Sequence, residues 1–123
     1  MASDEIRLER SDPAAVFVEL HGKHDAYTAE EIRNVFYALL AEHASIVVDL
    51  SGTEFIDSTV MGVLLGGRQA ATECGVGFAV LLGETADSEV RRALEVTGLM
   101  TVFWIATTRE GAVDAVQRSA QPV

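Results

Sequence analysis

The side chains best suited to chemistry in this sequence are the short oxygen-bearing residues Asp57, Ser58 and Thr59. They lie between an apolar segment and the start of a helical pattern. A hydroxyl in the first turn of a helix can carry a phosphoryl group, because the free backbone N–H groups and the helix dipole favour an anion there. Asp and Ser are also common helix N-caps, with no further role. Both interpretations stay open on the residues alone.

Other kinds of chemistry find little support in the sequence. His21, His24 and Asp25 lie close together, but no spacing typical of a zinc site surrounds them, so we expect no bound metal. No Gly-x-Ser-x-Gly elbow and no glycine-rich phosphate loop is present, so we expect no catalytic residues and no cofactor. The only lysine, Lys23, does not follow the last predicted strand, as a response-regulator receiver requires. A small serine hydrolase using Ser58 is the remote alternative, because no paired base accompanies that hydroxyl.

Composition and charge exclude several classes of partner, and the acidic charge itself serves either solubility alone or the attraction of a basic partner patch. The chain has 123 residues, 49% of them hydrophobic, and a formal net charge of −10. Nucleic acids and anionic membranes repel such a chain, so we expect neither as a partner. We expect one domain over residues 1–123, with a core from about 5 to 118. The polar N-terminus and the lack of a long apolar run predict a cytoplasmic protein, and the pattern around Cys74 predicts that its thiol is buried.

Strand and helix patterns alternate along the chain. The expected strands cover 6–10, 16–20, 46–50, 78–82 and 102–105. The expected helices cover 28–43, 58–73, 90–96 and 107–118, the first and last starting at capping-box pairs. The order ββαβαβαβα predicts an α/β fold with a mixed, mostly parallel sheet covered by about four helices. Functional groups collect beyond the carboxyl ends of such strands, so we expect segments 21–28 and 51–59 to lie together.

The helix expected after Ser58 contains an unusual stripe of small residues. Gly62, Gly66 and Ala70 are spaced four apart, and each helical glycine costs about 1 kcal/mol relative to alanine. Close packing of this stripe onto the sheet is the preferred explanation. A close-fitting partner surface is the alternative.

Three segments of the chain resemble the STAS family of anti-sigma factor antagonists. Residues 46–65 read IVVDLSGTEFIDSTVMGVLL, similar to the family's hydrophobic strand and Asp-Ser-(Ser/Thr)-Gly-(Leu/Met)-Gly helix start. Residues 20–29 resemble its Leu-x-Gly-Glu-Leu-Asp segment, and residues 97–99 resemble its Ser-Gly-Leu turn before the last strand. The resemblance covers nearly the whole chain in order and spacing. It implies a STAS-like domain.

The resemblance also implies a phosphorylation-controlled switch rather than an enzyme. In the family, the unmodified antagonist binds an anti-sigma factor serine kinase and thereby frees a sigma factor. The kinase phosphorylates the serine after the motif aspartate, which is Ser58 here with Thr59 as its rival, and a phosphatase acting on the phosphorylated form restores binding. The ATP belongs to the kinase. The implied partner-binding residues are Asp25, Asp57, Ser58, Thr59, Met61 and Gly62.

An alternative within the same family is a scaffold of a stress-signalling assembly, or a transporter-associated subunit without a phosphorylation switch. Two positions depart from the family's pattern: Val60 replaces the first motif glycine, and Lys23 replaces a glutamate. Val60 points either into the core or outward over Ser58. The apolar stripe that it forms with Met61, Leu64 and Leu65 favours the core.

Overall fold

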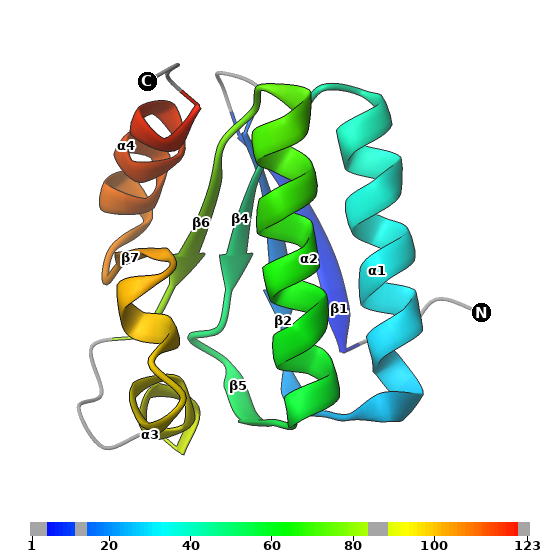
Figure 1. Cartoon of the computed structure of the whole chain (residues 1–123), viewed down its shortest axis with the longest axis vertical. Helices are drawn as coiled ribbons and strands as arrows, with labels where there is room; N and C mark the ends of the chain where they lie inside the picture. The colour runs from blue at the N-terminus through cyan, green and yellow to red at the C-terminus, as the bar shows by residue number, and fades with distance from the viewer. Residues whose placement is uncertain (1–4, 12–14, 84–88, 121–123) are drawn as a thin grey trace.

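The computed structural model describes residues 5–11, 15–83 and 89–120 (Figure 1). The strands are β1 (Ile6–Ser11), β2 (Ala15–Leu20), β3 (Gly22–His24), β4 (Ser45–Asp49), β5 (Thr53–Ile56), β6 (Phe78–Leu81) and β7 (Trp104–Ala106). The helices are α1 (Ala26–Ala41), α2 (Ser58–Cys74), α3 (Glu89–Val96) and α4 (Arg109–Ser119), with a 3₁₀ turn, η1, at Leu99–Thr101. None of the described helices is long and apolar enough to cross a membrane.

Five strands form the main sheet in the order β1-β2-β4-β6-β7. β1 runs antiparallel to β2, and the remaining neighbours are parallel. The central strands are mostly apolar and buried, as expected for strands that are covered on both faces. The expected α/β fold with a mixed, mostly parallel sheet is therefore confirmed.

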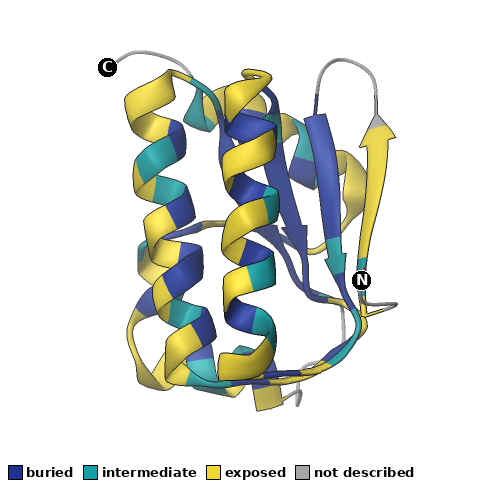
Figure 2. Ribbon diagram, turned by 90° about the vertical axis from the view of Figure 1, so that its right-hand side faces the viewer, coloured by how far each residue is buried: buried dark blue, intermediate teal, exposed yellow. Residues whose placement is uncertain are grey.

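Helices cover both faces of this sheet. Side chains from α1, α2 and α3 share one core with alternate strand residues such as Val18 and Val48. The intervening residues, among them Phe17 and Val47, pack on the other face with α4. Figure 2 shows the result: the central strands are buried, and α1 and α2 each carry a buried stripe toward the sheet and an exposed one toward solvent.

Several boundaries differ from the sequence-based expectations. α1 begins two residues before Thr28, because Asp25 provides the N-cap. α4 is capped by Thr108 rather than Thr107. The last strand starts later than expected, since the chain first forms η1. The thiol of Cys74 is exposed at the end of α2, so the expectation of a buried cysteine was wrong.

The glycines of α2 also differ from expectation. Gly62 and Gly66 are exposed, and a Cβ added to either would meet no atom within 4 Å. Packing against the sheet therefore does not explain them. The glycine that does pack closely is Gly67, where a Cβ would lie 2.7 Å from the ring of Phe36 and 3.0 Å from that of Phe78. The helix face turned to the sheet is thus one residue away from the predicted stripe.

Candidate functional site

Two short parallel strands bring the two motif segments together. In the β3–β5 pair, Lys23 lies opposite Phe55 and His24 opposite Ile56. The next backbone contact is between the Asp57 N–H and the His24 carbonyl oxygen, at 3.3 Å. Segments 21–28 and 51–59 therefore lie side by side, as expected, and they start α1 and α2 from adjacent strand ends.

A buried histidine holds this pair of strands in place. His24 is 0% exposed, and its Nε2 lies 3.0 Å from the His21 carbonyl oxygen. Because a carbonyl only accepts, Nε2 donates this hydrogen bond, and Nδ1 forms a second hydrogen bond with the Thr28 hydroxyl at 3.0 Å. Nearby, the Thr53 hydroxyl donates to the Leu20 carbonyl at 2.6 Å. These bonds use the imidazole structurally, and within the described residues no group of three or more His, Cys, Asp or Glu could hold a metal.

Each of the two helices begins at an aspartate. The Asp25 Oδ1 accepts from the Tyr27 N–H at 2.9 Å, and the Asp57 Oδ1 accepts from the Val60 N–H at 2.9 Å. Of the two candidate caps of α2, Asp57 and Ser58, it is therefore Asp57 that occupies the N-cap position. Asp25 is exposed and Asp57 half-buried, so both carboxylates border the same surface.

Ser58 is the first residue of α2, and its side chain is exposed. No described residue forms a hydrogen bond with its hydroxyl, so in this part of the chain no histidine or carboxylate acts as a base for it. Thr59 is exposed as well. A hydroxyl in this setting is accessible to an external enzyme and close to the positive end of a helix dipole.

The next three residues separate into core and surface. Val60 is 0% exposed, which confirms that its side chain points into the core. Met61 is half-buried, and its sulfur lies 4.0 Å from the Thr97 hydroxyl at the end of α3. Gly62 is exposed. The predicted partner-binding residues therefore all lie at the N-terminal ends of α1 and α2, from the capping aspartates to Gly62 at the start of the second turn of α2.

Replacing Val60 with glycine is expected to lower the free energy of unfolding by about 1–3 kcal/mol, because helix propensity and apolar burial are both lost. Urea denaturation followed by circular dichroism measures this change. Unchanged stability of the Val60→Gly variant would contradict the buried position of Val60.

Two exposed aromatic residues near the caps were not identified from the sequence. Tyr27 is 95% exposed and Phe55 is 42% exposed. Phe55 also borders an open hollow of about 550 Å³ with Lys23, Glu54 and Glu89. The only signal in the sequence is that an aromatic residue lies within two positions of each aspartate. This signal indicates a shared surface only when β3 pairs with β5, and that pairing was not predicted from the sequence.

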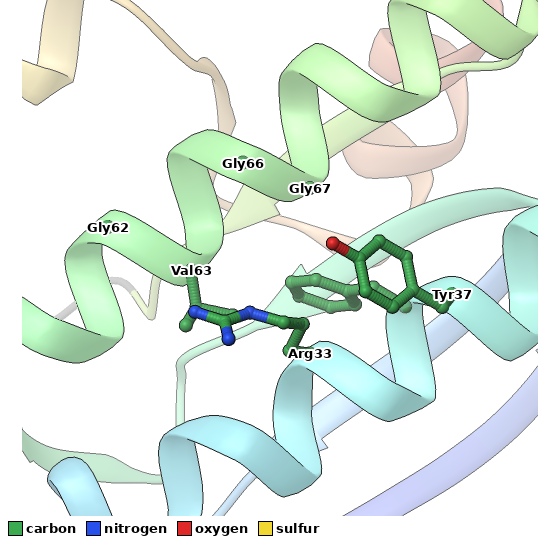
Figure 3. A pocket seen from close by; sticks show the side chains of 7 residues that line it. Arg33, Tyr37, Gly62, Val63, Gly66 and Gly67 are labelled. Atoms are coloured by element: carbon green, nitrogen blue, oxygen red, sulfur yellow. The ribbon is translucent and has the colours of Figure 1, made fainter.

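A groove between α1 and α2 extends this surface along the exposed glycines (Figure 3). Its volume is about 290 Å³. Arg33 and Tyr37 of α1 lie on one side of it, and Gly62 and Gly66 of α2 line the other. The absence of side chains on these glycines keeps this part of α2 open to close contact.

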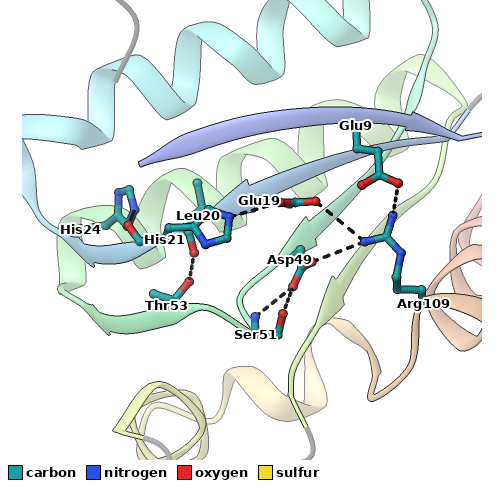
Figure 4. Close-up of polar contacts among 9 residues, drawn as sticks. All are labelled: Glu9, Glu19, Leu20, His21, His24, Asp49, Ser51, Thr53 and Arg109. Atoms are coloured by element: carbon teal, nitrogen blue, oxygen red, sulfur yellow. Dashed lines mark hydrogen bonds and ion pairs between the residues drawn. The ribbon is translucent and has the colours of Figure 1, made fainter. Parts of the chain in front are cut away.

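On the other face of the sheet, a polar network joins strand ends to α4 (Figure 4). The Arg109 guanidinium lies 4.0 Å from the centre of the Phe17 ring and 2.6 Å from the Glu9 carboxylate. It also lies 3.8 Å from each of the Glu19 and Asp49 carboxylates. One cation therefore offsets three carboxylates at a part of the sheet where their mutual repulsion would otherwise be unfavourable.

Comparison with known proteins agrees with this architecture. The STAS domain family model matches residues 5–112. An anti-sigma F factor antagonist of Lysinibacillus sphaericus is 28% identical over 113 residues, covering 90% of this chain and 93% of that protein. The anti-sigma-B factor antagonist of Bacillus subtilis (strain 168) is 26% identical over 96 residues, covering 78% of this chain and 85% of that protein.

A solved structure gives the same answer for the fold. The crystal structure of an anti-sigma factor antagonist from Mycobacterium paratuberculosis superposes with a TM-score of 0.78 at 26% sequence identity, covering 95% of this chain and 99% of that one. The match of the family model spans most of the chain and includes both helix starts of the candidate site. The chain therefore belongs to the STAS domain family.

Proposed function

We propose that this STAS domain is an anti-sigma factor antagonist that acts in the cytoplasm, binds an anti-sigma factor serine kinase and thereby frees a sigma factor. The observation that carries the proposal is the Ser58 hydroxyl, exposed at the first position of α2 and next to the capping carboxylate of Asp57. The names of its relatives, which are antagonists of anti-sigma factors, support the same role.

The kinase contacts the surface formed by the first turns of α1 and α2. Tyr27 and Phe55 supply exposed apolar area, which is the usual source of binding energy at protein interfaces. The carboxylates of Asp25 and Asp57 add negative charge to a chain whose net charge is −10. A basic patch on the kinase is the complementary partner surface.

Phosphorylation of Ser58 is the switch. The γ-phosphoryl group of the kinase-bound ATP moves to the Ser58 oxygen, ADP leaves, and the hydroxyl proton passes to a base of the kinase. The helix N-terminus tolerates the roughly −1.5 to −2 charge of the phosphate, so α2 stays folded. The hydroxyl has to lie against the nucleotide phosphates for transfer, so the phosphoserine then faces like charge and added bulk, and the complex dissociates.

The experiment that tests this function is phosphorylation by the cognate kinase. With ATP, the mass of the chain should rise by about 80 Da, the mass of one phosphoryl group. The peptide map should place the modification on Ser58. A phosphatase acting on the phosphorylated form should return the original mass. Thr59→Ala should be modified like the wild type, and Ser58→Ala should not be modified.

Phosphorylation of a residue other than Ser58 or Thr59 would contradict the proposed phosphorylation site. A chain that retrieves a scaffold or a transporter subunit, and is never modified, would instead be a STAS domain without a phosphorylation switch.

A charge-mimicking variant separates binding from folding. Ser58→Asp should keep the wild-type circular dichroism spectrum, because a carboxylate is well tolerated in the first turn of a helix. Its affinity for the kinase should fall at least about tenfold relative to Ser58→Ala, a difference of about 1.4 kcal/mol. Isothermal titration with the purified kinase measures both variants. Equal affinities for Ser58→Asp and Ser58→Ala would show that charge at this position does not control binding.

A further inference from the structure

A second hollow lies far from Ser58, at the other end of α2. It has a volume of about 260 Å³ and is lined by Arg68, Thr72, Val76, Phe78, Trp104, Arg118 and Ser119. Phe78 and Trp104 are the first residues of β6 and β7, so the hollow lies at the amino ends of these strands. Thr72 follows Ser58 by fourteen helical positions, or about 21 Å at 1.5 Å per residue.

The hydroxyl groups of this hollow are already engaged. The Thr72 hydroxyl donates to the Arg68 carbonyl oxygen at 3.0 Å. The Ser119 hydroxyl donates to the Val116 carbonyl oxygen at 3.1 Å and accepts from the Phe78 N–H at 2.9 Å. A ligand would therefore meet mainly the two arginine side chains and the apolar walls.

The arginines give the hollow a positive charge. Within the described residues, the Arg68 guanidinium forms no hydrogen bond or ion pair. The Nε of Arg118 lies 3.0 Å from the Asp114 carboxylate, but both side chains are more than half exposed, and such helical pairs are weak. In a chain of net charge −10, this hollow is a local site for an anion.

The hollow adjoins an open sheet edge. β7 is the last strand of the sheet, and no described strand pairs with its outer side. The Leu82 N–H donates to the Ala106 carbonyl oxygen at 2.8 Å, so the polar groups of Ala106 face inward. Those of Ile105 point to the outer side, because successive residues of a strand alternate. Trp104 is 44% exposed beside them.

We propose that this edge binds an extended acidic peptide segment of a partner protein. The backbone of the segment pairs with Ile105, as in strand addition to an exposed sheet edge. One of its carboxylates pairs with Arg68 and Arg118, and an apolar side chain packs against Trp104. The site does not depend on the Ser58 switch, so a partner held here stays bound in both phosphorylation states.

The test uses Trp104, the only tryptophan of the chain, as a fluorescent reporter. The probe is the peptide acetyl-Glu-Val-Glu-Phe-Glu-Val-Glu-amide, titrated against the full chain. We expect a saturable change in Trp104 emission and slower hydrogen exchange of the Ile105 amide. Affinity should fall at least about tenfold when salt is raised from about 0.05 M to about 0.5 M, because the pairing is electrostatic. Ser58→Asp should bind the peptide like the wild type.

Arg68→Glu should lower the affinity of the chain for the peptide at least tenfold. If this variant does not keep the wild-type circular dichroism spectrum, Arg68→Gln serves the same purpose. Arg33→Glu is the matched control, because it makes the same charge change on α1 and should leave affinity unchanged. The proposal is overturned by no saturation up to about 1 mM, a concentration equivalent to about 4 kcal/mol of binding. The proposal would also be overturned if a peptide with lysine in place of each glutamate bound with the same affinity. The same holds if Arg33→Glu lowered the affinity for the peptide as much as Arg68→Glu does. Equally tight binding of 4-phenylbutyrate without protection of Ile105 would indicate a small carboxylic acid as the ligand and refute the peptide.

Discussion

Replacing Gly77 with alanine is expected to lower the free energy of unfolding by about 3 kcal/mol, at the upper end of the cost of overpacking. Gly77 is buried immediately before β6. An added Cβ would overlap the Val116 carbonyl oxygen, and it would lie 2.7 Å from the carbonyl carbon and 2.9 Å from the Ser119 Oγ. Val116 contributes backbone atoms here, which cannot rotate away, so α4 would have to move off the sheet.

Urea denaturation measures this effect, and Gly66→Ala is the matched control. Position 66 is exposed and a Cβ there would meet no atom within 4 Å, so the same substitution should raise stability by about 1 kcal/mol through helix propensity. Gly67→Ala should lie between the two, because its Cβ would meet side-chain rings that can shift. If Gly77→Ala and Gly66→Ala unfolded at the same urea concentration, the close approach of α4 to β6 would be wrong.

The main elements could be predicted from the sequence because buried positions recur with the period of a helix or a strand. The strand expected at 46–50 is Ser45–Asp49, and the helix expected at 58–73 is Ser58–Cys74. The strands β3 and β5 show no recognisable hydrophobic pattern, since they have only three and four residues and include the exposed Lys23 and Glu54. Their pairing comes from the fold, which brings two loops together after distant strands.

The candidate site was predictable in part for the same reason. The transition from strand to helix limited the cap of α2 to Asp57 or Ser58, and the structure places Asp57 at the cap and Ser58 exposed beside it. The capping-box spacing of Thr28 and Glu31 predicts a helix start at Thr28, whereas Asp25 is the N-cap of α1 in the structure. In the structure, Thr28 bonds to His24 instead. The direction in which each glycine of α2 faces could not be read from a four-residue spacing alone.

His24→Ala is expected to be the most damaging single change within the site. The substitution leaves a cavity at a fully buried position and removes the partner of the His21 carbonyl and of the Thr28 hydroxyl. Together these losses should lower the free energy of unfolding by about 2–4 kcal/mol. His43→Asn is the control: His43 is exposed and has a φ of 57°, a conformation that asparagine tolerates, so its stability should change by less than about 0.5 kcal/mol.

The functional consequence of His24→Ala follows from the bond between its backbone carbonyl and the Asp57 N–H. When β3 loosens from β5, the caps of α1 and α2 no longer share one rigid support. We therefore expect the Asp57 amide to exchange hydrogen faster than in the wild type, and the affinity for the kinase to fall at least about tenfold at a temperature where the variant remains folded. His24→Asn should recover part of both losses, because its side-chain amide can still donate one of the two hydrogen bonds. If His24→Ala bound the kinase like the wild type despite faster exchange at Asp57, the spatial relation of the two caps would not matter for binding.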